Sequence, residues 1–105
     1  MRINIKDVLG HRLLSRESAP KIRELMTDAL KLGGNVELDF VGVCPTQGGI
    51  DEMIGMLIYD QGVNILMRVQ FQNCHKFTKA LLHLVTDDRI HQRFAFQRKL
   101  AKDAP

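Results

Sequence analysis

The chain has 105 residues, of which 45% are hydrophobic, and its formal net charge is +3. This length fits one domain with a single core. Its apolar runs are far too short for a membrane span, and its charged first residues lack the apolar region of a signal peptide. We therefore expect a single cytoplasmic domain over residues 1–105 that does not associate with a membrane.

The first half of the chain predicts two strands separated by a helix. Residues 2–6 and 35–41 each alternate apolar and polar side chains, which is typical of half-buried strands. Ser18 predicts the N-cap of the helix, and Gly33 predicts its end. One apolar stripe recurs at helical spacing between them, formed by Ile22, Leu25, Met26, Ala29 and Leu30.

The middle of the chain repeats this order. A glycine-containing loop at residues 42–49 precedes a helix predicted to run from Ile50 to Gly62. Residues 63–72 alternate over their whole length, which predicts a third strand with Met67 in the core. Asn73 then predicts the N-cap of a third helix.

The end of the chain is its basic part. Thr86 predicts the cap of a separate fourth helix, which we expect at residues 87–102. Residues 89–105 contain five basic residues and a single acid, Asp103, whereas the preceding residues contain ten basic and eleven acidic ones. Such a segment is typical of a solvated helix face, and it also suits a surface that contacts phosphate backbones.

This order of elements predicts an α/β fold with a small, mostly parallel sheet. Strands covered on both faces read as continuous apolar runs, whereas these strands alternate. We therefore expect two layers, with helices mainly on one face of the sheet and the other face open. The open face is expected to carry polar side chains, namely Arg2, Asn4, Lys6, Glu37, Asp39, Asn64, Arg68 and Gln70.

Three short segments together resemble a known family. Residues 38–43 read LDFVGV, residues 50–52 read IDE, and residues 68–73 read RVQFQN. Their order and spacing resemble the STAS domains of anti-sigma-factor antagonists, and are closer still to the STAS-like domain family of unknown function. The resemblance spans roughly residues 8–90, and each segment alone is a weak motif.

The resemblance implies a two-layer STAS-like fold and a non-enzymatic regulatory role. STAS domains bind a kinase-like ATPase or an anti-sigma-type regulator, and phosphorylation of a serine at the start of the second helix switches that binding. Here Gly48 and Gly49 lie near the family's serine positions. Thr46 is the only hydroxyl in the loop, which makes it the candidate phosphorylation site.

We accordingly expect a protein partner to bind the loop and the helix that follows it. The expected contact residues are Cys44, Pro45, Thr46, Gln47, Gly48, Gly49, Asp51 and Glu52. Asp51 and Glu52 are expected to offer exposed acceptors. Bulky replacements of Gly48 and Gly49 are expected to weaken binding and to leave the fold unchanged.

The alternative function is nucleic-acid binding through the basic C-terminal helix. Its expected phosphate contacts are Arg89, Arg93, Arg98 and Lys99.

Enzymatic chemistry is not indicated. His11, Cys44, Cys74 and His75 follow predicted strands and are expected near one edge of the sheet, where open α/β sheets bind ligands. They are ligand types that zinc prefers, but their spacing lacks a chelating pair. We expect reduced thiols, no metal, no cofactor and no catalytic residue, and the sequence leaves the oligomeric state open.

Overall fold

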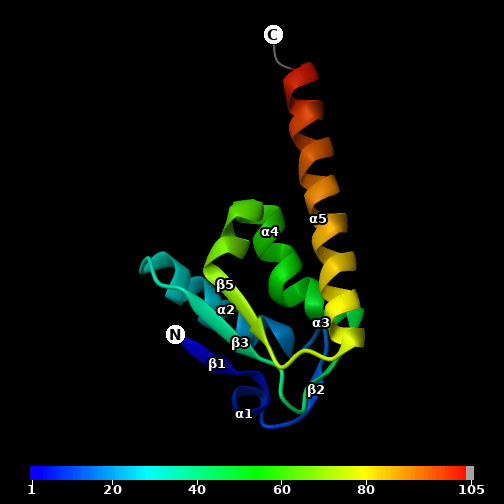
Figure 1. The fold of residues 1–105 in the computed structure, drawn as a ribbon. Coiled ribbons are helices and arrows are strands. Elements are labelled where there is room, and N and C mark those ends of the chain that lie inside the picture. Colours follow the sequence, from blue (N-terminus) through cyan, green and yellow to red (C-terminus); the bar gives the residue numbers. More distant parts are fainter. Residues whose placement is uncertain (104–105) are drawn as a thin grey trace.

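Three short parallel strands form the central sheet of the computed structural model (Figure 1). The structure describes the backbone of residues 1–103 and the side chains of residues 1–99. The strands are β1 (Arg2–Asn4), β3 (Val36–Asp39) and β5 (Val69–Gln72), arranged in the order β1-β3-β5. The parallel α/β prediction is therefore confirmed, with β3 in the centre and β5 at an edge.

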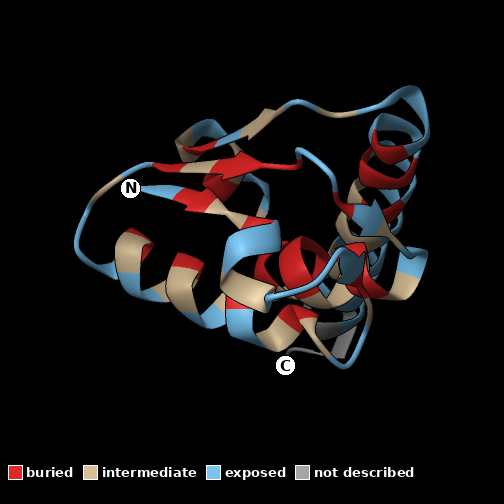
Figure 2. Cartoon of the chain, turned by 90° about the horizontal axis from the view of Figure 1, so that it is seen from below, coloured by how far each residue is buried: buried red, intermediate tan, exposed pale blue. Residues whose placement is uncertain are grey.

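The two faces of the sheet differ as the alternation predicts. Ile3, Leu38 and Phe71 are in register on the face that the helices cover. Helix α2 (Ala19–Lys31) packs on this face through its buried stripe of Ile22, Met26 and Leu30 (Figure 2). Within residues 1–103 no helical layer covers the opposite face, so the prediction of a two-layer domain is confirmed.

The open face is smaller than predicted. Arg2, Glu37 and Gln70 lie in register on it, as expected. Lys6, however, belongs to helix α1 (Ile5–Leu9), and Asn64 and Arg68 lie outside the sheet. These three predicted positions are wrong because β1 and β5 are shorter than the strands that the sequence alternation suggests.

The first strand ends early because Asn4 caps a helix. The Asn4 side chain accepts a hydrogen bond from the Asp7 amide at 2.9 Å, which is the usual N-cap arrangement. The strand predicted over residues 2–6 is therefore limited to β1. After α1, a second pair of short parallel strands forms between β2 (Leu13–Leu14) and β4 (Cys44–Pro45).

The helix after the loop is one continuous coil with a wide turn inside it. It consists of α3 (Gln47–Ile50), the π-helical turn η1 (Asp51–Gly55) and α4 (Met56–Gln61), and it ends at Gly62 as predicted. It starts earlier than the predicted Ile50 because Thr46 is its N-cap.

More than half of the third predicted strand is helical. Residues Val63–Arg68 form the 3-10 helix η2, and only β5 pairs with the sheet. Met67 is 86% exposed, so its predicted place in the core is wrong. Arg68 donates hydrogen bonds to the carbonyls of Leu30 and Gly34, which holds η2 against the end of α2. Tertiary contacts of this kind override strand propensity.

The C-terminus is a single helix, α5 (Lys76–Asp103), which corrects the prediction of two helices. Thr86 lies inside it and is not a cap. Asn73 precedes the helix with φ 58° and donates from its amide to the Asp39 carboxylate at 2.8 Å, so it is not a helix cap either. The far half of α5 extends beyond the rest of the fold (Figure 1). The side chain of Lys102 and residues 104–105 lie outside the described residues.

Candidate functional site

The predicted partner-binding loop runs along the β2–β4 pair into helix α3. Thr46 connects these elements through its backbone and its hydroxyl. Its amide donates to the Leu14 carbonyl at 3.0 Å, its hydroxyl donates to the same carbonyl at 3.1 Å, and the hydroxyl accepts from the Gly49 amide at 2.9 Å. The hydroxyl of Thr46, the candidate phosphorylation site, is therefore committed to capping the helix.

Gly49 is required by the close approach of α3 to β2. A Cβ atom built on Gly49 would overlap the Leu14 carbonyl oxygen and would lie 2.6 Å from its carbonyl carbon. A Cβ on Gly48 would instead meet the Arg16 guanidinium at 3.1 Å, which is the end of a flexible side chain. The expectation that both glycines accept bulky residues without disturbing the fold is therefore wrong for Gly49.

Asp51 is not a free acceptor. The Arg89 guanidinium binds its two carboxylate oxygens at 2.7 Å each, which joins α5 to the η1 turn. Arg16 approaches the same carboxylate at 3.5 Å. The hydrogen bond from Arg89 is the main reason why the pKa of Asp51 lies below its usual value, and burial opposes it.

Glu52 is likewise paired. Arg23 of α2 lies 2.6 Å from its carboxylate, and Arg16 lies 3.1 Å from it. These contacts, with Arg23 contributing most, lower the pKa of Glu52. The expectation of exposed acceptors is therefore wrong, since both carboxylates join the surrounding elements to one another.

A small polar depression lies beside this network. It measures about 130 Å³, and its walls include Arg16, Gln47, Asp51, Arg89 and Gln92. Gln47 is exposed at the start of α3. The depression shows that the loop and α5 contribute to one continuous surface, although they are distant in the sequence.

Exposed apolar side chains accompany the loop. Leu13 of β2 is 49% exposed and Val41 is 51% exposed, and Cys44 of β4 is also exposed. Leu13 pairs in register with Cys44, so these two residues are neighbours on the strand pair. Sequence analysis missed Leu13 and Arg16. The only signal was the Leu13-Leu14 doublet, since a short strand can bury just one of two consecutive residues.

Asp39 is integrated into the sheet rather than exposed on its open face. It is buried, and its carboxylate accepts from Asn73, from the Val41 amide at 3.0 Å and from Arg2 at 2.9 Å. Asn73, then Val41, contribute most to the lowering of its pKa. The carboxylate thereby fixes the loop that leaves the central strand.

The four predicted nucleic-acid contacts differ in availability. Arg89 is bound to Asp51, and the Arg93 guanidinium donates to the Tyr59 carbonyl. Arg98 and Lys99 are exposed on the extended part of α5, where the Arg98 guanidinium lies 5.9 Å from the centre of the Phe94 ring.

The cysteines and histidines do not form a metal centre in the part of the chain whose side chains are described. No group of three or more His, Cys, Asp or Glu side chains is placed there to hold an ion. Burial is the main reason why the pKa of the Cys74 thiol is raised, while the nearby Lys79 partly opposes this effect. A raised pKa disfavours the reactive thiolate.

Within residues 1–103, no helix has the length and low charge that a membrane span requires.

Comparison with known proteins gives no match among protein-family models, among curated proteins or among solved structures.

Proposed function

We propose that this protein is a non-catalytic regulatory module that binds a protein partner. The binding surface would consist of the β2–β4 strand pair and the first turn of α3, which we call the strand-pair surface. The observation that carries the proposal is the exposure of Leu13, Val41 and Cys44 on and beside this pair. Parallel strands are normally covered on both faces, so apolar side chains left open on them favour a partner.

The surface is also rigid, which favours binding. Thr46 and the paired carboxylates of Asp51 and Glu52 fix the loop to three neighbouring elements. Little conformational entropy is lost when a fixed loop binds. The resemblance to STAS domains suggests a kinase-like ATPase or an anti-sigma-type regulator as the partner.

The test is an affinity capture from lysate of the native host, followed by binding measurements with the purified partner. Leu13→Ser should weaken binding about tenfold or more, since truncating a central apolar contact costs at least about 1.4 kcal/mol. Leu32→Ser is the matched control, because Leu32 is 89% exposed at the end of α2, away from this surface. A partner that binds both variants equally would contradict the proposal.

Nucleic-acid binding is the second candidate, and the exposed Arg98 and Lys99 on the extended part of α5 favour it. Because Arg89 and Arg93 are engaged within the fold, few phosphates would be neutralised. The slope of log affinity against log salt should then be about −2 with duplex DNA, at about −0.9 for each phosphate. Affinity that does not change with salt, or that survives replacement of Arg98 and Lys99 by Gln, would exclude this function.

A further inference from the structure

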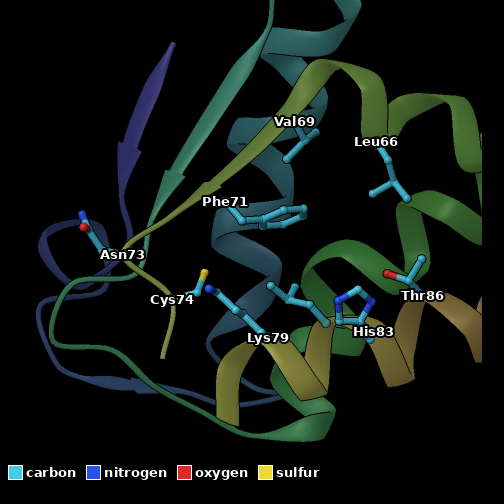
Figure 3. Close-up of a pocket in the computed structure, with 9 residues that line it drawn as sticks. Leu66, Val69, Phe71, Asn73, Cys74, Lys79, His83 and Thr86 are labelled. Atoms are coloured by element: carbon cyan, nitrogen blue, oxygen red, sulfur yellow. The ribbon is translucent and has the colours of Figure 1, made fainter. Parts of the chain in front are cut away.

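An open groove of about 640 Å³ lies between the edge strand β5 and the first turns of α5 (Figure 3). Helix α5 packs on α3, η1 and α4, and these contacts keep it away from the sheet. Among the elements that the structure describes, none fills the space beside the edge of β5. Its volume lies within the range of about 300–1,000 Å³ that is usual for small-molecule sites.

Much of the groove wall is apolar. Val69 and Phe71 contribute from β5, Leu66 from η2 and Leu82 from α5. Figure 3 shows the side chains of Leu66 and Phe71 pointing into the space that separates these elements. Covering such a wall with an apolar ligand gains about 25 cal/mol for each Å² removed from water.

The polar groups of the groove are concentrated on α5. Lys79 and His83 are four residues apart, so they share one face of the helix, and both are exposed at the groove. Asn73, Cys74 and Thr86 add neutral groups. Among the described residues that line the groove, none is acidic, and the nearby Asp39 carboxylate is already bonded to Arg2 and Asn73.

We propose that this groove binds a small amphipathic carboxylate. The apolar body would lie against Phe71, Val69 and Leu66, and the carboxylate would be held by Lys79 and His83. The Lys79 ammonium, which Figure 3 shows extending toward Cys74, is on a flexible stem, and the His83 imidazole one helical turn away can also donate, so the two groups suit an anionic headgroup at the mouth of an apolar site. The basic groups of the wall thus complement the carboxylate of the ligand, and the apolar part of the wall favours a hydrocarbon tail.

A peptide strand is a poorer occupant, although β5 is an edge strand. The Phe40 amide donates to the Gln72 carbonyl, so the backbone N–H and C=O groups of Gln72 face β3. Because these groups alternate in direction along a strand, the backbone groups of Phe71 face the groove. The Val69 amide already donates to the Leu66 carbonyl. The free edge therefore lacks the run of alternating backbone groups that strand addition uses.

The test uses the full chain and three probes with the same ten-carbon tail. Decanoate, decanol and decyltrimethylammonium are titrated into labelled protein, and amide shifts are followed by two-dimensional NMR. Decanoate should give saturable shifts at Val69, Phe71, Lys79 and His83. It should bind about tenfold more tightly than decanol, which corresponds to one charge-assisted hydrogen bond, and the cation should bind more weakly still.

Lys79→Gln should remove the preference for decanoate over decanol, and the spectrum of the variant reports directly whether it is folded. Lys76→Gln is the matched control, because it removes the same charge from the first turn of α5 outside the groove. The proposal is overturned if decanoate gives no saturable shift, if decanol binds equally well, or if the two variants behave alike. None of the groove residues belongs to the strand-pair surface, so this result and the partner test are independent.

Discussion

Replacing Gly49 with alanine is the most direct test of how the loop and α3 are held. The added Cβ would lie 2.6 Å from the Leu14 carbonyl carbon, and the nearest atoms belong to the backbone. They cannot move aside as a side chain does, because the same carbonyl accepts both hydrogen bonds from Thr46. We therefore expect the substitution to separate α3 from β2.

The size of the effect follows from two opposing contributions. Overpacking against a fixed neighbour costs about 3 kcal/mol at the upper end of its usual range. The better helix propensity of alanine returns at most about 1 kcal/mol. The free energy of unfolding should fall by about 2 kcal/mol, and the Tm by about 10 °C for a domain of this size.

Urea unfolding followed by circular dichroism at 222 nm measures this difference. Gly48→Ala is the matched control, since the three atoms nearest to its Cβ belong to the Arg16 side chain and the free energy of unfolding should change by less than about 0.5 kcal/mol. If the two variants unfold at the same urea concentration, the close contact between Gly49 and Leu14 does not exist as described.

Two further predictions concern the ion pair on α5 and the thiols. Asp51→Asn should lower the free energy of unfolding by about 2 kcal/mol at pH 7, while Asp60→Asn, an exposed control, should not. The pKa of Asp51 is lowered in the folded state, so its ionised carboxylate contributes to the free energy of unfolding above the ordinary value of 3.8. This contribution is lost as the pH falls through the folded pKa. The difference in the free energy of unfolding between wild type and Asp51→Asn should therefore narrow in acid. A difference that is the same at pH 7 and pH 3 would refute the role of the Arg89 pair. With iodoacetamide at pH 7.5, the exposed Cys44 should be alkylated faster than Cys74, whose thiol pKa burial raises. Mass spectrometry of the digested protein measures both rates, and faster labelling of Cys74 would contradict this prediction.

The ion pairs also change how the two candidate functions relate to each other. Arg89, predicted as a phosphate contact, is bound to Asp51, predicted as a partner contact. Neither residue is therefore free for the role that its position in the sequence suggested. The exposed residues that remain, Leu13 on the strand pair and Arg98 on the extended helix, allow the two functions to be tested by separate substitutions.

Local patterns predicted the parts of the fold that depend on neighbours in the sequence. The stripe of Ile22, Met26 and Leu30 identified α2, because a helix repeats every 3.6 residues and one of its faces must be buried. Alternation in residues 35–41 identified the central strand, and Gly62 marked the end of α4. The sheet was expected to have one open face, and the structure confirms it.

Long-range contacts decided the rest. The alternation in residues 63–68 fits a strand, yet the chain there bonds to the end of α2 through Arg68 and forms a 3-10 helix. Thr86 and the acids after it look like a helix start, but Thr86 lies inside the single helix α5, which Arg89 joins to Asp51 of η1. The STAS-like resemblance and the partner remain predictions.

The sequence alone therefore determined the class of fold, its single open face and the position of the loop before α3. Only the tertiary structure decided that Gly49 must lack a side chain, that Asp51 and Glu52 are paired, and that a groove lies beside β5. The physical reason is that periodicity reports which side of an element is buried. Close approaches and ion pairs join residues more than thirty positions apart, such as Leu14 with Thr46 and Asp51 with Arg89, and no local pattern encodes them.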